Sequence, residues 1–140
     1  MPYNVLIVDD SSTMRNVIKK ILRLSGIQFA SCFEASNGKE ALELLEANWV
    51  DLILSDINMP VMDGFGLLRA LKAQGSLGDV PVVLITTESN QDRLQEALNL
   101  GAKGYIHKPF TPEMVRSTLA AVMGEINESA VSDSDEGCDF

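Results

Sequence analysis

The sequence has few aromatic residues, only two cysteines and no long run of apolar residues. Aromatic side chains make up 6% of the chain, whereas 46% of its residues are hydrophobic, so the expected core is aliphatic. No apolar run approaches the ~20 residues that a membrane-spanning helix needs. Asp9 and Asp10 come too early to leave room for the apolar region of a signal peptide. Cys32 and Cys138 have no metal-ligand spacing. We therefore expect a reduced, cytoplasmic protein without a membrane segment.

Basic residues are also scarce, and the charge is unevenly spread. The net charge is -9, and no basic stripe is present that could follow a nucleic-acid backbone, so nucleic acid is not an expected partner. Six of these net negative charges lie in residues 125–140, which leaves -3 for the first 124 residues. The segment after Asn127 loses apolar periodicity and is rich in Ser and Asp. We expect one domain over residues 1–127 and a disordered, solubilising acidic tail over 128–140.

Apolar periodicity alternates between two modes along the chain. Short β-rich runs predict five strands, over residues 4–8, 29–33, 52–54, 82–86 and 105–106. Apolar residues at helical spacing follow each run and predict five helices, around residues 14–22, 41–45, 67–71, 94–98 and 115–126. Strict alternation of this kind predicts an α/β, doubly wound (βα)5 fold of the flavodoxin-like type. In that fold a five-stranded parallel sheet has the order 2-1-3-4-5 and helices cover both of its faces.

Capping residues agree with these helix boundaries. Asn37, with Glu40 three residues later, predicts an N-cap and its capping-box partner. Thr111 followed by proline predicts a second N-cap. Gly26 and Gly101 stand where helices are expected to end. Two further interpretations concern single residues outside these caps: Gly64 is expected to permit the turn after Pro60, and Trp49 is expected to pack inside the protein.

Charged and hydroxyl side chains follow four of the five predicted strands. They are Asp9 and Asp10, Asp56, Thr86 and Thr87, and Lys108. In an open parallel sheet, ligands bind beyond the carboxyl ends of the strands, so these side chains are expected to share one site. Neighbouring strands lie ~4.8 Å apart, which puts strand five roughly 10 Å from strand three in this order. A lysine side chain can cover most of that gap.

Three carboxylates in one pocket would repel one another and raise a pKa. A divalent cation removes this penalty, and oxygen-only ligands favour Mg2+ or a similarly hard ion. With the metal on one side, Lys108 would reach a bound phosphate from the other side and the Thr86 hydroxyl would bind a further oxygen. Phosphoryl transfer requires chiefly positioning and charge neutralisation, and this set supplies both.

Four motifs carry a resemblance to a known family. They are Val-Asp-Asp-Ser-Ser-Thr-Met-Arg over 8–15, Ser-Asp-Ile-Asn-Met-Pro-Val-Met-Asp-Gly over 55–64, Ile-Thr-Thr over 85–87 and Tyr-Ile-His-Lys-Pro-Phe over 105–110. Together they resemble the signatures of bacterial two-component response-regulator receiver domains, most closely the stand-alone CheY-like chemotaxis regulators. The resemblance covers roughly residues 4–126.

The resemblance implies a role for each matching residue in the site. Asp56 would be the phosphoacceptor. Asp10 and Asp56 would ligate Mg2+ directly, Asp9 would act through water, and the backbone carbonyl of Asn58 would complete the protein ligands. Lys108 would pair with the phosphoryl group and would precede a cis proline.

The resemblance also implies a switch and partners. Thr86 would move toward the phosphate and Tyr105 would turn inward, altering the face formed by helix four, strand five and helix five. Asn58 and Glu88 would tune the phosphate lifetime. The implied partners are a histidine kinase, a phosphatase and a downstream protein such as the flagellar motor switch. The protein itself is expected to be a monomer.

Several alternatives are open at this stage. An aspartyl-phosphate hydrolase would need a second acid two residues after its nucleophile, where this chain has Asn58. A flavin or nucleotide binder would need a glycine- or hydroxyl-rich loop where Asp9 and Asp10 stand. A receiver that no longer takes phosphate would have lost one of the expected acids, and none is missing. Ser11, Asn90 and Gln91 depart from the pattern of well-known chemotaxis regulators, which leaves a phosphate sink or shuttle as an alternative to motor binding.

Overall fold

The computed structural model describes residues 3–74 and 80–124 of the chain. Five strands alternate with five helices in these residues: β1 (Tyr3–Val8), α1 (Ser12–Leu24), β2 (Phe29–Ala35), α2 (Gly38–Ala47), β3 (Leu52–Ser55), α3 (Gly64–Ala73), β4 (Val82–Thr86), α4 (Gln91–Asn99), β5 (Gly104–His107) and α5 (Pro112–Gly124). None of the helices in the described part combines the length and the apolar character needed to cross a bilayer. The expected acidic tail and Cys138 lie outside the described residues.

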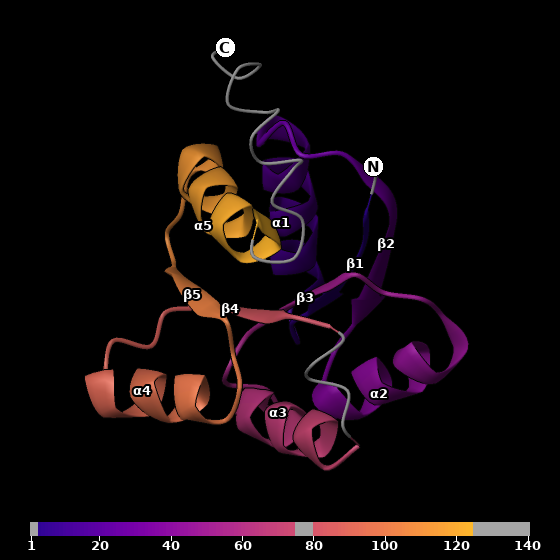
Figure 1. The fold of residues 1–140 in the computed structure, drawn as a ribbon, viewed down its shortest axis with the longest axis vertical. Coiled ribbons are helices and arrows are strands. Elements are labelled where there is room, and N and C mark those ends of the chain that lie inside the picture. The colour runs from indigo at the N-terminus through magenta and orange to yellow at the C-terminus, as the bar shows by residue number, and fades with distance from the viewer. Residues whose placement is uncertain (1–2, 75–79, 125–140) are drawn as a thin grey trace.

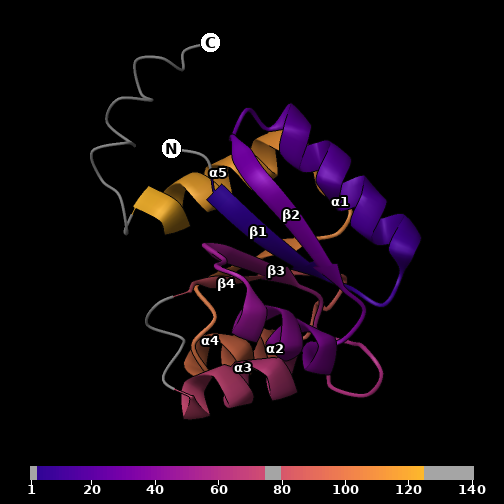
Figure 2. The same cartoon turned by 90° about the vertical axis from the view of Figure 1, so that its right-hand side faces the viewer.

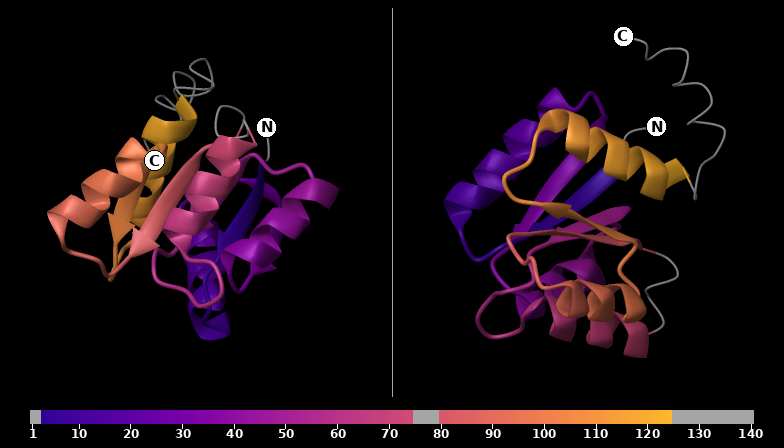
Figure 3. Two further views of the ribbon diagram at one scale, coloured as in Figure 1. Left: turned by 90° about the horizontal axis from the view of Figure 1, so that it is seen from below. Right: turned by 90° about the vertical axis from the view of Figure 1, so that its left-hand side faces the viewer.

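The five strands form one parallel sheet in the order β2-β1-β3-β4-β5. Helices α1 and α5 cover one face of the sheet, and α2, α3 and α4 cover the other (Figure 1). Figure 2 shows the same two helical layers from the side of β2. In Figure 3, the view from below places α3 between α2 and α4. The predicted doubly wound α/β fold and its strand order are confirmed.

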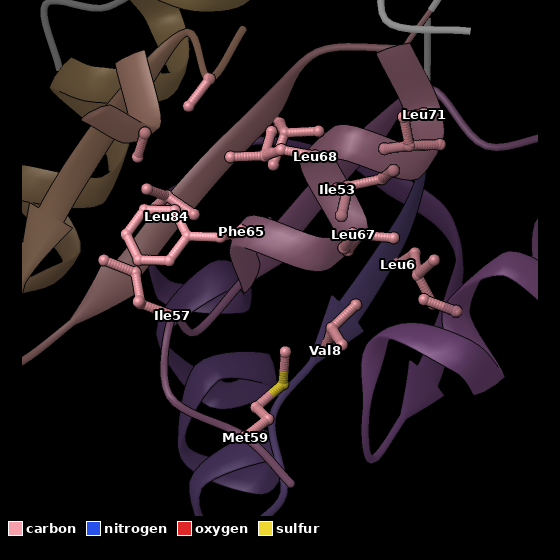
Figure 4. Packing of buried hydrophobic residues seen from close by; sticks show 14 of the residues in the cluster. Leu6, Val8, Ile53, Ile57, Met59, Phe65, Leu67, Leu68, Leu71 and Leu84 are labelled. Atoms are coloured by element: carbon pink, nitrogen blue, oxygen red, sulfur yellow. The ribbon is translucent and has the colours of Figure 1, made fainter. Parts of the chain in front are cut away.

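The central strands are apolar on both faces, and their side chains divide the core into two layers. In β1, Leu6 and Val8 pack on the side of α2, α3 and α4, whereas Val5 and Ile7 pack on the side of α1 and α5. Figure 4 shows the first layer, in which side chains of α3 lie against those of the strands. Its labelled members are Leu6, Val8, Ile53, Ile57, Met59, Phe65, Leu67, Leu68, Leu71 and Leu84. Burial on both sides explains why these strands read as continuous apolar runs.

Most predicted caps are confirmed. The Asn37 side chain accepts a hydrogen bond from the Glu40 amide, and the Thr111 hydroxyl accepts one from the Met114 amide. Gly26 and Gly101 follow the ends of α1 and α4 with φ of 87° and 120°, the left-handed region that glycine adopts without steric cost.

The reciprocal half of the predicted capping box is different. The Glu40 carboxylate binds the Ser36 amide and hydroxyl, at 2.9 and 2.8 Å, instead of the amide of the cap residue Asn37. It therefore fixes the chain one residue earlier than the motif predicts.

The expected packing of Trp49 is wrong. This side chain is 75% exposed, and its indole Nε1 donates a hydrogen bond to Asp51 Oδ1 at 2.9 Å. Trp49 lies in the connection between α2 and β3, beyond the last helical residue, so neither helical layer covers it. The apolar character of tryptophan alone therefore did not indicate that its side chain is exposed.

The role expected for Gly64 also differs. Gly64 is the first residue of α3, and the left-handed residue of the turn after Pro60 is Val61, with φ of 71°. A Cβ on Gly64 would lie 2.6 Å from the carbonyl oxygen of Asp56 and 2.9 Å from Cα of Ile57, both backbone atoms. The absent side chain therefore allows α3 to start directly against the backbone that carries Asp56.

Replacing Gly64 with alanine should destabilise the fold. The added Cβ meets backbone that cannot rotate away, and overpacking of this kind costs roughly 1–3 kcal/mol. Gly104→Ala is the matched control, because a Cβ there would meet its nearest atom, a side-chain carbon of Thr118, at 3.8 Å. Urea unfolding of both variants checks this, and equal losses of unfolding free energy would contradict the steric explanation.

Candidate functional site

The polar residues that follow four strands lie at one edge of the sheet. Asp56 continues the ladder between β1 and β3, because its amide donates a hydrogen bond to the carbonyl of Val8 at 2.9 Å. Lys108 continues the ladder between β4 and β5 in the same way, because its amide binds the carbonyl of Thr86 at 2.8 Å. Backbone pairing therefore sets the level of these residues at the sheet edge. The predicted convergence at this edge is confirmed by the geometry.

Three carboxylates meet in this site. Asp9, Asp10 and Asp56 each offer an oxygen within 4.8 Å of the others. Asp9 is buried, Asp56 is half-buried and Asp10 is exposed. None is needed to cap α1, because the hydroxyl of Ser11 accepts the hydrogen bond from the Met14 amide. Asp9 Oδ1 accepts a hydrogen bond from the Ser11 amide, which orients the buried carboxylate. Capping of α1 therefore does not account for these acids.

Lys108 reaches across the sheet edge to two of these acids. Its Nζ lies 3.2 Å from Asp9 Oδ2 and 3.5 Å from Asp56 Oδ2, and 13% of the side chain is exposed. The side chain thus spans the distance between β5 and β3, as its length and the strand order predict. The peptide bond between Lys108 and Pro109 is cis, as the family resemblance implies.

Thr86 completes the inner wall of the site. It is fully buried at the end of β4, and its hydroxyl acts to lower the pKa of Asp56. The same oxygen accepts a hydrogen bond from the Glu88 amide at 3.0 Å. Thr86 therefore connects the Asp56 carboxylate to the loop that leads into α4.

Burial raises the pKa of Asp56, because desolvation disfavours its charged form. The Lys108 ammonium, the Ile57 amide and the Thr86 hydroxyl oppose this rise, whereas the negative charge of Asp9 adds to it. The Ile57 amide donates to Asp56 Oδ1 at 2.7 Å. The ionised carboxylate thus has partners, but they do not offset its removal from water.

The donor set of this cluster fits a hard divalent cation. Its ligands are carboxylate oxygens alone, which Mg2+ and similar ions prefer over soft metals. A cation would also relieve the repulsion that helps to keep the pKa of Asp56 high. The assignment of direct, water-mediated and Asn58 backbone ligands stays a prediction.

Of the two residues predicted to form a switch, Thr86 belongs to the inner wall of the site, whereas Tyr105 lies in β5. Tyr105, in the edge strand β5, is half-buried and packs against the core layer of α2, α3 and α4. Together with His107, Met114 and Thr118 it lines a shallow groove between β5 and α5. Rotation of Tyr105 stays a prediction.

Sequence reasoning did not identify the role of Arg93. Its guanidinium binds Glu88 Oε1 at 2.9 Å and Asn58 Oδ1 at 3.3 Å, and so joins the two residues predicted to tune the site. Arg93 and Asn58 are 35 positions apart, so no local pattern points to this contact. The only available signal is the cation in the first turn of α4, a place where helices favour acids.

Comparison with known proteins agrees with this geometry. The family model of the response regulator receiver domain matches residues 5–120. The chain belongs to the response-regulator receiver family. This receiver is 40% identical to the chemotaxis protein CheY of Pseudomonas aeruginosa over 123 residues, which cover 88% of this chain and 98% of that protein. It is also 40% identical to CheY1 of Helicobacter pylori strain J99 over 121 residues, 86% of this chain and 96% of that protein.

Solved receiver structures share the fold. The chemotaxis protein CheY4 of Vibrio cholerae superposes with a TM-score of 0.76 at 36% identity, covering 87% of this receiver and 99% of that chain. The CheX–CheY complex of Borrelia burgdorferi with BeF3 and Mg2+ contains a chain with a TM-score of 0.76 at 28% identity, covering 88% and 90%. These findings support a two-component regulator of the chemotaxis type.

Asp56→Asn should raise the free energy of unfolding at neutral pH in a chelating buffer. The folded-state pKa of Asp56 is raised, so the stability associated with its protonated form is present at low pH and is lost as pH rises through that pKa. Asparagine does not ionise, so it removes the cost of burying a charged Asp56 at neutral pH, an effect on the order of 1 kcal/mol in the free energy of unfolding. The gain should shrink on acidification. Urea unfolding at several pH values checks this, with exposed Asp92→Asn as the control, and a pH-independent difference would contradict it.

Proposed function

We propose that this receiver accepts a phosphoryl group on Asp56 from a histidine kinase and signals in the phosphorylated state. The observation that supports this most directly is the set of Asp9, Asp10 and Asp56 within 4.8 Å, with Lys108 Nζ 3.5 Å from Asp56. An acyl phosphate needs a carboxylate nucleophile beside groups that neutralise the incoming anion. Asp56 supplies the nucleophile, and Lys108 supplies one of the neutralising charges.

In the proposed reaction, an Asp56 carboxylate oxygen attacks the phosphorus of a phosphohistidine. The new bond is P–O, the bond that breaks is P–N, and its electron pair leaves with the imidazole nitrogen, which takes a proton from solvent. Lys108 holds one oxygen of the phosphoryl group, and the Thr86 hydroxyl donates to another. Burial of Thr86 and Asp9 keeps bulk water from one side of the reacting carboxylate.

Asp10 and Asp56 would hold Mg2+ directly, with Asp9 acting through water and Asn58 through its backbone carbonyl. When bound, the ion supplies charge neutralisation at phosphoryl oxygens and a template for their orientation. The presence of Mg2+ in the structure of the related Borrelia burgdorferi CheY complex supports this choice. Asp9 then keeps Lys108 oriented through their 3.2 Å contact.

The proposed output is a change in the face formed by α4, β5 and α5. Thr86 would move toward the phosphate and Tyr105 would turn inward, which would alter the surface offered to a downstream protein. Asn58 and Glu88 would tune the lifetime of the phosphate from the rim of the site. A cytoplasmic, monomeric protein is part of the same proposal.

Chemotaxis is the favoured pathway, because the chemotaxis proteins CheY of Pseudomonas aeruginosa and CheY1 of Helicobacter pylori are 40% identical to this chain. The proposed partner is therefore a flagellar motor switch protein, with a phosphatase to end the signal. The complex of a related CheY with CheX supports a second protein partner. Asn90, which departs from the pattern of well-known chemotaxis regulators, is the N-cap of α4. Its side chain accepts hydrogen bonds from the amides of Asp92 and Arg93. A phosphate sink or shuttle is the alternative that partner binding must separate.

Asp56→Asn should abolish labelling by acetyl phosphate in Mg2+, because the amide is not a nucleophile. Mass spectrometry of the acyl phosphate measures the labelling. In the wild type, removal of Mg2+ with a chelator should reduce labelling at least tenfold, because the ion would supply several kilocalories of charge stabilisation. Asp92→Asn is the matched control, an acid outside the cluster. Labelling that persists in Asp56→Asn would place the nucleophile elsewhere.

Lys108→Ala should still take up phosphate but should lose phosphorylation-dependent partner binding. The ammonium is the group that connects β5 to the phosphoryl oxygen, so its removal uncouples the site from the output face. Capture of a motor switch protein with and without phosphodonor measures this, and Lys103→Ala, an exposed lysine before β5, is the control. Normal phosphorylation-dependent capture by Lys108→Ala would contradict the role. Equal capture by the wild type in both states would favour the sink.

A further inference from the structure

The Arg93 side chain contacts three residues, Glu88, Asn58 and Phe65. It belongs to α4, its Nε donates to Glu88 Oε1 at 2.9 Å, and its terminal nitrogen donates to Asn58 Oδ1 at 3.3 Å. The guanidinium also lies over the ring of Phe65 in α3, with 4.8 Å between its carbon and the ring centroid. These three contacts restrict the conformation of the Arg93 side chain, and we call the arrangement the Arg93 clamp.

The two polar partners of Arg93 flank the reactive residues in sequence. Asn58 stands two residues after Asp56, and Glu88 stands two residues after Thr86. Asn58 and Glu88 lie in the loops that follow β3 and β4, which are neighbours in the sheet. The Glu88 amide is bonded to Thr86 Oγ1, whose hydroxyl acts on Asp56. Arg93 therefore closes a ring of contacts beside Asp56, from one loop to the other.

Glu88 adds a negative charge close to a site that must admit an anion. Its side chain is 17% exposed, and its second oxygen accepts a hydrogen bond from the Asn90 amide at 3.1 Å. In the described residues, Arg93 is its ion-pair partner. Without that partner, the carboxylate would stand uncompensated next to the path of a doubly charged phosphodonor, which it would repel.

We propose that Arg93 is a positioning residue of the phosphoacceptor site, which neutralises Glu88 and fixes it and Asn58 at the rim beside Asp56. Arg93 touches neither Asp56 nor the carboxylate cluster in this structure, so it acts through the two rim residues. Its role is to keep one wall of the site open to anionic donors. This inference rests on the proposed phosphorylation of Asp56.

The chain contains a matched control for this arginine. Arg69 also lies over the Phe65 ring, at 6.0 Å, and forms an ion pair with Glu96 at 3.4 Å. Both side chains of that pair are at least half-exposed, at 58% and 50%, whereas the Glu88 side chain is 17% exposed. Removing Arg69 therefore removes a similar guanidinium, ring contact and ion pair without freeing a charge at the rim.

The test measures the rate of Asp56 labelling by acetyl phosphate at saturating Mg2+. Arg93→Ala should label about threefold to tenfold more slowly than the wild type, the effect of one unpaired charge on a doubly charged anion several ångström away. The deficit should narrow as salt screens the repulsion. Adding Glu88→Gln to Arg93→Ala should restore most of the rate, whereas Arg69→Ala should label like the wild type.

Restoration by Glu88→Gln separates a charge effect from a loss of structure, because a fold weakened by Arg93→Ala would not recover when a second contact is removed. Labelling of Arg93→Ala at the wild-type rate, or faster, would overturn the inference. A slow variant that Glu88→Gln does not rescue would overturn it as well. A wild type that is not labelled would instead refute the proposed function, so the two failures are distinguishable.

Discussion

The repulsion among Asp9, Asp10 and Asp56 is the interaction on which the rest of this site depends. Carboxylate oxygens of the three acids lie within 4.8 Å of one another, and among the described residues the one nearby ammonium is that of Lys108, so the cluster carries excess negative charge. Burial adds to this excess and raises the pKa of Asp56. The folded chain tolerates the arrangement because its core is large and apolar. The same imbalance favours a cation, and a cation in turn favours a phosphoryl group.

The parallel sheet holds these charges together by placing apolar strands behind them. The last three residues of β1 and residues 52–54 of β3 pack in the two core layers, and the first charged residues appear where the strands end. The start of α3 at Gly64 lies against the backbone of Asp56, which further fixes the position of this residue. A rigid platform with polar loops at one edge positions reacting groups more accurately than a loop could alone.

Contacts that begin at Asp56 extend to α4. Thr86 joins the Asp56 carboxylate to the amide of Glu88, and Arg93 joins Glu88 to Asn58 and to the Phe65 ring. These contacts link the electrostatic environment of Asp56 to the first turn of α4. This link offers a physical route by which a charge change at Asp56 could reach α4, which membership of the receiver family by itself does not specify.

The sequence by itself determined the alternation of strands and helices, the sheet order and the convergence of Asp9, Asp10, Asp56, Thr86 and Lys108. The alternation and the convergence follow from apolar periodicity and from the rule that parallel strands end at one edge, whereas the sheet order came from the flavodoxin-like fold that the receiver resemblance implies. Tertiary structure alone decided which side chains meet across layers. The exposure of Trp49, the close approach at Gly64 and the Arg93 clamp depend on helices packing against loops far away in sequence, and no short-range pattern encodes such distances.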